Sequence, residues 1–151
     1  MNPDIILFDL DGTLTESAPG ITNAASYALS TYGIHTDPAS LLHFIGPPLH
    51  ESFMKDYGFS QAEALEAVRR FRIYYLDRGW RENSPYPGIP ELLEVLRTAG
   101  KRLIVATSKP EPQAKQICDY FGLSAHLELV CGADPNNPAS STKVKVFRNA
   151  L

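Results

Sequence analysis

Asp4-Ile5-Ile6-Leu7-Phe8-Asp9-Leu10-Asp11-Gly12-Thr13-Leu14 is the stretch that decides the fold. Its four consecutive apolar residues predict a buried strand, and the acids, glycine and threonine that follow predict an abrupt polar turn. Residues i and i+2 of an extended chain point to the same side, so Asp9 and Asp11 should project together. Neighbouring carboxylates repel each other unless a cation lies between them or one carries a proton. The stretch therefore points first to a metal site at the end of the first strand.

The composition favours a cytoplasmic protein. The 151 residues suffice for one core and a small appendage, and their net charge of −3 without a basic block argues against nucleic acid as a partner. Cys118 and Cys131 form no CxxC pair, so we expect them to be buried small hydrophobes in a reducing compartment. The apolar runs fall short of the roughly 20 residues that a membrane span needs, and we expect no membrane partner.

The spacing of apolar residues changes along the chain. Residues 16–80 show helical spacing and no convincing strand, and Ser60-Gln61-Ala62-Glu63 is a capping box before a long helix. Helices and strands then alternate, with strands expected at 103–106 and 127–130, helices at 89–99, 111–121 and 142–151, and a loop at 132–141. This alternation predicts an α/β fold, in which a parallel sheet carries functional groups at the carboxyl ends of its strands.

The run Phe8-Asp9-Leu10-Asp11-Gly12-Thr13-Leu14 resembles the first motif of the haloacid dehalogenase superfamily in its phosphatase version. Three further stretches are similar to the phosphoglycolate phosphatase-like branch of this superfamily: Ile45-Gly46-Pro47-Pro48-Leu49, Pro85-Tyr86-Pro87-Gly88 and Val105-Ala106-Thr107-Ser108-Lys109-Pro110. The resemblance implies a Rossmann-like core at residues 1–15 and 86–151. It also implies an all-helical cap at residues 16–85 that closes over the site and selects the substrate. An ordinary strand that ends in an acidic turn is the alternative explanation.

The resemblance assigns roles to both acids. Asp9 would attack phosphorus to form an aspartyl phosphate, and Asp11 would protonate the leaving oxygen and later take a proton from water. Both residues would hold Mg²⁺ as its metal ligands, Asp9 through its carboxylate and Asp11 through its backbone carbonyl. Superfamily members that cleave carbon–halogen or carbon–phosphorus bonds lack the second acid, so Asp11 favours a phosphoester substrate.

Two further candidate phosphate ligands follow the second expected strand. Thr107 matches the position of a hydroxyl that binds the transferring phosphoryl group, although a threonine there can instead bond the backbone. Ser108 forms a second capping box with Glu111, and the helix amino end that this predicts would attract phosphate.

The superfamily's third motif supplies a lysine that neutralises the nucleophile and the phosphoryl group. We assign this role to Lys143, because Ser140-Ser141-Thr142 and Val144 around it are similar to the motif. Lys145 and Lys109 stay open as alternatives, and a solvated lysine is the common explanation for any of the three.

The superfamily's fourth motif, a pair of acids after a further strand, has no counterpart between Lys143 and Leu151. The sequence therefore resembles a truncated member in which Mg²⁺ binds weakly and the first strand, Ile5 to Phe8, is an exposed apolar edge. We expect little phosphatase activity from these residues alone and self-association through that edge. Near-normal turnover by a monomer would contradict this expectation.

We predict a Mg²⁺-dependent phosphatase that hydrolyses a small phosphorylated metabolite, such as a phosphoglycolate-like monoester. The alternative is a non-catalytic fragment that binds phosphate or a partner chain. A protein-tyrosine phosphatase and a phosphosugar mutase are further enzyme alternatives.

Overall fold

The computed structural model describes residues 4–137, 140 and 142–150, and the chain forms two compact units. The first, which we call the sheet unit, comprises residues 1–16 and 84–151; the second, the helical unit, comprises residues 17–83. The chain therefore crosses between the units twice, after Glu16 and after Asn83. The roles of core and cap that the resemblance implies for these regions stay predictions.

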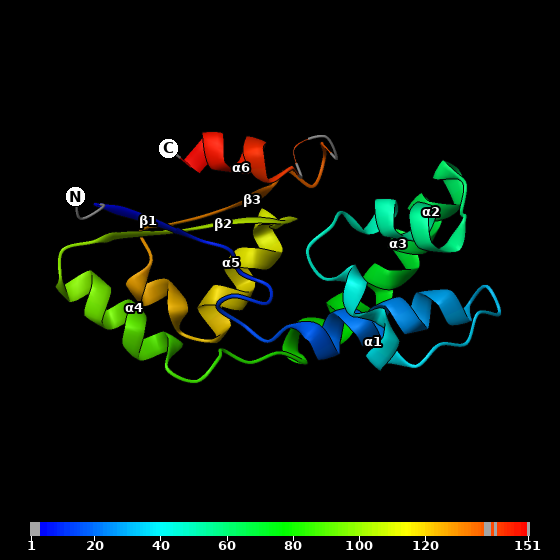
Figure 1. Ribbon diagram of the computed structural model, residues 1–151, viewed down its shortest axis with the longest axis horizontal. Helices are drawn as coiled ribbons and strands as arrows, with labels where there is room; N and C mark the ends of the chain where they lie inside the picture. Colours follow the sequence, from blue (N-terminus) through cyan, green and yellow to red (C-terminus); the bar gives the residue numbers. More distant parts are fainter. Residues whose placement is uncertain (1–3, 138–139, 141, 151) are drawn as a thin grey trace. The chain divides into compact units, whose positions relative to one another are not determined.

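The sheet unit contains three parallel strands in the order β1 (Ile5–Phe8), β2 (Arg102–Pro110) and β3 (Leu129–Ala133). Figure 1 shows α4 (Ile89–Thr98) and α5 (Glu111–Tyr120) below the sheet and α6 (Lys143–Ala150) above it. A short 3₁₀ helix, η3 (Leu123–His126), connects α5 to β3. This arrangement confirms the predicted α/β fold with helices on both faces of a parallel sheet.

The register of the sheet places the end of β1 beside the middle of β2. Ile5 pairs with Arg102 and Phe8 pairs with Val105, so the turn after β1 follows the part of the sheet in which β2 continues from Ala106 to Pro110 beside β3. Within the described residues β1 has one neighbouring strand, and all four of its residues are partly exposed. The predicted edge position of β1 is thus observed for this part of the chain, whereas self-association through it stays a prediction.

The position of β3 differs from the prediction. A strand forms after α5 as predicted, but its expected bounds of 127–130 are wrong, because β3 begins at Leu129 and includes Gly132, which we placed in a loop. Small residues after an apolar run indicate a loop locally, but Ala133 pairs with Pro110 at the end of β2. Pairing with a strand far away in the sequence therefore outweighs the local signal.

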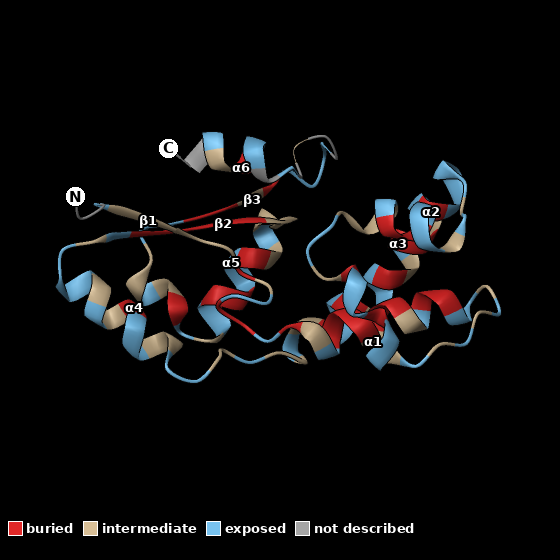
Figure 2. Cartoon of the chain, viewed as in Figure 1, coloured by how far each residue is buried: buried red, intermediate tan, exposed pale blue. Residues whose placement is uncertain are grey.

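The helical unit contains α1 (Ala18–Ser30), η1 (Pro38–Phe44), α2 (Leu49–Tyr57), α3 (Gln61–Asp77) and η2 (Gly79–Arg81). Its core includes Leu29, Phe44, Phe53 and Phe71, and Figure 2 shows buried residues along α1 and α3. The predicted capping box is confirmed: Glu63 N donates to Ser60 Oγ at 3.2 Å, and Ser60 N donates to Glu63 Oε2 at 2.8 Å. Among the described helices, none has the length and apolar character that a membrane crossing requires.

Candidate active site

Hydrogen bonds to the backbone carbonyl of one buried residue, Leu10, hold the turn after β1 together. The carbonyl oxygen of Leu10 accepts hydrogen bonds from the amides of Thr13, Leu14 and Thr15 at 3.0–3.2 Å. Gly12 adopts a φ of 76°, a left-handed conformation that favours glycine, and its amide donates to Thr15 O at 2.8 Å. Leu10 is fully buried, as expected for a residue that turns away from the acids beside it.

Both predicted acids lie in this turn. The amide of Leu10 donates to Asp9 Oδ1 at 2.9 Å, which orients the Asp9 carboxylate at the end of β1. Asp11 Oδ1 lies 3.3 Å from Lys109 Nζ, and the two side chains are 13% and 7% exposed. Asp11 Oδ1 is buried and accepts no hydrogen bond from the described residues, so Lys109 is its electrostatic partner.

Thr107, Ser108 and Lys109 occupy a bulge in β2. Ala106 pairs with Cys131 and Pro110 pairs with Ala133, so three residues of β2 face one residue of β3. Such a bulge redirects side chains at the end of a strand. Thr107 is 2% exposed, and its Oγ1 accepts the Lys109 amide at 3.2 Å. The hydroxyl proton of Thr107 is therefore not used in this bond.

The capping role expected for Ser108 is wrong. Helix α5 begins at Glu111 with Pro110 at its N-cap, no side chain caps it, and Ser108 lies in β2. The strand continues to Pro110 because this residue still pairs with β3, which moves the start of the helix beyond the reach of Ser108. Its assignment as a phosphate ligand stays a prediction.

Of the three candidate lysines, the structure describes the side chains of Lys109 and Lys145, and Lys145 is an exposed residue of α6. Lys143 is the first residue of α6, but its side chain lies outside the described part of the structure, so the assignment made from the sequence stays a prediction. Lys109, which we left as an alternative, lies beside Asp11, a predicted catalytic acid. The sequence signal for Lys109 was its position near the tip of the second expected strand.

Asp9 and Asp11 fit Mg²⁺ in kind, because magnesium binds oxygen ligands and is commonly held by one or two carboxylates with water and substrate phosphate. Because Asp11 Oδ1 faces Lys109 Nζ at 3.3 Å, the oxygens that fit the ion are the Asp9 carboxylate and the Asp11 backbone carbonyl, as the resemblance implies. Within the described ranges, no three His, Cys, Asp or Glu side chains cluster as a complete protein shell. The donor set therefore suits a metal that keeps ligands from solvent or substrate.

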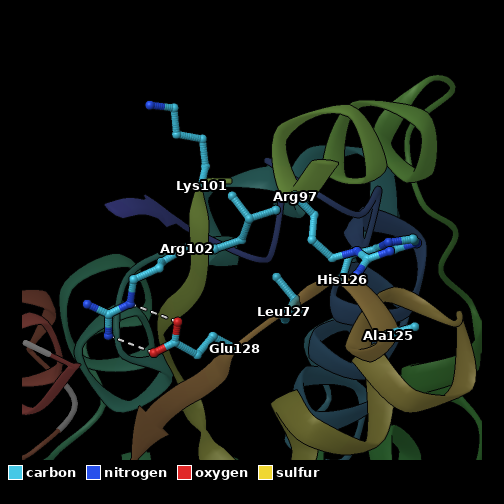
Figure 3. Close-up of a pocket in the computed structure, with 8 residues that line it drawn as sticks. Arg97, Lys101, Arg102, Ala125, His126, Leu127 and Glu128 are labelled. Carbon is cyan, nitrogen blue, oxygen red and sulfur yellow. Dashed lines mark hydrogen bonds and ion pairs between the residues drawn. The ribbon is translucent and has the colours of Figure 1, made fainter. Parts of the chain in front are cut away.

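A pocket of about 210 Å³ lies at the other end of the sheet, near the start of β2 and before β3. It is lined by Arg97, Lys101, Arg102, Leu103, Ala125, His126, Leu127 and Glu128 (Figure 3). Arg102 donates to both carboxylate oxygens of Glu128 at 2.7 and 2.8 Å, and His126 Nδ1 lies 2.9 Å from Glu94 Oε2. A carboxylate thus partners Arg102 in this pocket, which contains none of the predicted site residues.

Residues 6–143 match the family model described as haloacid dehalogenase-like hydrolase. A tyrosine-protein kinase PtkA from Mycobacterium tuberculosis is 44% identical over 99% of this chain and 51% of its own length. A 5'-nucleotidase from Pseudomonas aeruginosa is 48% identical over 85% of this chain and 59% of its own. A phosphoglycolate phosphatase from Aquifex aeolicus is 37% identical over 86% and 61%. The chain thus spans about half to three fifths of the length of these relatives.

A solved structure of a predicted phosphatase from Clostridium acetobutylicum has the same fold. It superposes with a TM-score of 0.94 at 42% sequence identity, covering 97% of this chain and 68% of that chain. The similarity to phosphatases that the sequence motifs indicated is therefore observed in both sequence and structure.

Proposed function

The chain belongs to the haloacid dehalogenase-like hydrolase family, and on that premise we propose that it hydrolyses a small phosphate monoester through an aspartyl phosphate. The observation that carries this proposal is the Asp11–Lys109 pair beside the turn after β1. It places a carboxyl group suited to proton transfer and an ammonium group suited to phosphate at the same end of the sheet.

The proposed reaction consists of two successive displacements at phosphorus. In the first, an Asp9 carboxylate oxygen attacks phosphorus, the bond to the leaving oxygen breaks, and Asp11 protonates that oxygen. In the second, a water oxygen attacks phosphorus, Asp11 takes the water proton, and the bond to Asp9 breaks to release phosphate. Asp9 is thereby regenerated as a carboxylate. Asp11 acts as acid and then as base, so both displacements depend on its position.

Thr107 and Lys109 stabilise the charge that develops on the phosphoryl oxygens. The Thr107 hydroxyl accepts the Lys109 amide, and we propose that it donates its own proton to a phosphoryl oxygen. A donor held in a buried position before the reaction needs little reorganisation as negative charge develops. Lys109 adds a positive charge in a largely buried position, where electrostatic interactions are stronger than in water. Ser108 and Lys143 are proposed as further phosphate ligands.

Asp9 and Asp11 are the residues that would hold Mg²⁺, the cofactor that we propose. When bound, the ion supplies charge neutralisation for the nucleophile and the phosphoryl oxygens. Such neutralisation is required because Asp9 and its substrate are both anionic. Lys109, which lies beside Asp11, contributes a further positive charge to this neutralisation.

We propose a small phosphorylated metabolite as the substrate, in a cytoplasmic protein. Two relatives are named 5'-nucleotidase and phosphoglycolate phosphatase, and both names imply a phosphate monoester as the substrate of those proteins. Selection among monoesters would fall to the helical unit, the predicted cap. The partly exposed β1 supports self-association as a further proposal.

The test is hydrolysis of p-nitrophenyl phosphate with and without Mg²⁺. Asp9→Asn should abolish Mg²⁺-dependent release of phosphate, whereas Asp4→Asn, which changes an exposed acid just before β1, should preserve it. Equal activity of the wild-type and Asp9→Asn proteins would remove Asp9 from the mechanism. Release of no phosphate above the blank by the wild-type chain would favour the non-catalytic alternative. A phosphosugar isomer in place of free phosphate would favour a mutase.

A further inference from the structure

We propose that Gly132 is a positioning residue, whose missing side chain allows the bulge at residues 107–109 to hold Lys109 against Asp11. The catalytic consequence of this inference rests on the function proposed above, but the positioning itself does not. Gly132 is the single β3 residue between Cys131, which pairs with Ala106, and Ala133, which pairs with Pro110. It therefore lies directly opposite the bulge.

The space beside Gly132 is filled by backbone. A Cβ atom at this position would lie 2.5 Å from Lys109 O, 2.6 Å from Glu111 Cα and 2.7 Å from Glu111 N. Contacts this short repel strongly, and no side-chain rotation relieves them because all three atoms belong to the main chain. A larger residue at 132 must therefore displace the turn from Lys109 to Glu111, the strand β3, or both.

Two weaker contacts hold the bulge and the residues after it in place. The Gly132 amide approaches Glu111 Oε1 at 3.4 Å, and the Lys109 amide donates to Thr107 Oγ1 at 3.2 Å. These single hydrogen bonds are easier to break than the β2–β3 pairing. We therefore expect the bulge, rather than β3, to move when a side chain is added at 132. Lys109 would move with its carbonyl, and its ammonium would leave Asp11.

The first measurement is amide hydrogen exchange followed by NMR in the wild-type, Gly132→Ala and Val130→Ala proteins. Val130 is a buried residue of the same strand, so its truncation controls for general weakening of β3. Gly132→Ala should speed exchange of the Lys109 amide by about tenfold or more, whereas Val130→Ala should not act selectively on this amide. Unchanged Lys109 exchange in folded Gly132→Ala would overturn the proposal. Complete loss of folding would also overturn it, because we infer a local displacement.

The second measurement is a double-mutant cycle of Gly132→Ala with Lys109→Gln, using calorimetric binding of inorganic phosphate. Alone, Gly132→Ala should weaken binding by about tenfold. In the Lys109→Gln background it should weaken binding no further, because the group that it displaces is already absent. Equal losses in both backgrounds would show that Gly132 does not act through Lys109.

The two measurements separate the positioning role from the function. Faster Lys109 exchange in Gly132→Ala, together with no phosphate binding by the wild-type protein, would support the positioning role and count against the proposed function. Phosphate binding that is equal in wild-type and Gly132→Ala would support the function and overturn the catalytic consequence inferred for Gly132.

Discussion

Replacement of Lys109 by methionine should destabilise the sheet unit, because it leaves the Asp11 carboxylate without its cationic partner. The two charges are 3.3 Å apart, and at an effective dielectric constant of about 20 their attraction is about 5 kcal/mol. Side-chain exposures of 7% and 13% limit screening by water. Removing one member of a largely buried pair costs about 3–5 kcal/mol, so we expect Lys109→Met to lower the free energy of unfolding by about 3 kcal/mol.

The assay is urea-dependent hydrogen exchange of β2 amides, which reports on the sheet unit. Trp80, the single tryptophan, lies in the helical unit, and its fluorescence serves as an internal reference that should not change. Lys115→Met is the matched control, since Lys115 is 52% exposed and pairs with Glu111 at the surface, and it should cost at most about 1 kcal/mol. Adding Asp11→Asn to Lys109→Met should recover about 1–3 kcal/mol. A cost for Lys109→Met no larger than that for Lys115→Met would refute the buried pair.

Three further predictions concern other parts of the molecule. Burial, with a smaller contribution from nearby carboxylates, raises the pKa of the Cys118 thiol to about 11. The Cys118 thiol should therefore react with a thiol reagent at neutral pH only after the protein unfolds, and fast labelling of the folded protein would contradict this. The hydrogen bond from Arg102 lowers the pKa of Glu128 below its usual 4.5. The resulting stabilisation is fully present above pH 4.5 and is lost as the pH falls through the lower pKa that Glu128 has in the folded state. Glu128→Gln should therefore flatten the acid limb of the stability curve, and an unchanged limb would argue against this ion pair. Phe53→Ala removes a fully buried ring whose centroid lies 4.9 Å from that of the Phe44 ring. The substitution should destabilise the helical unit by about 3–5 kcal/mol, measured by Trp80 fluorescence in a urea titration. A loss below about 1 kcal/mol would contradict this packing.

Features that depend on neighbouring residues could be predicted from the sequence. The apolar run Ile5–Phe8 forms a strand, Leu10 is buried beside the acids, and Ser60 caps its helix with Glu63. In each, a pattern of a few residues specifies the backbone conformation, because the interacting groups lie within four residues of one another.

Features that depend on strand register could not be predicted in this way. Ser108 and Glu111 have the spacing of a capping box, but the pairing of Pro110 with Ala133 extends β2 and shifts the helix start. The same pairing places Gly132 in a strand. The partner of Asp11 likewise depends on the bulge that carries Lys109, in which three residues of β2 face one residue of β3. Local patterns contain no information on such distant contacts.

Capture of beryllium fluoride tests the central claim, that Asp9 accepts a phosphoryl group. This reagent mimics an acyl phosphate on a carboxylate and needs no turnover, so it tests the nucleophile even where hydrolysis is slow. We predict bound fluorine signals by ¹⁹F NMR in the wild-type protein with Mg²⁺, and none in Asp9→Asn. Identical signals from the two proteins, or none from the wild-type protein, would contradict the account.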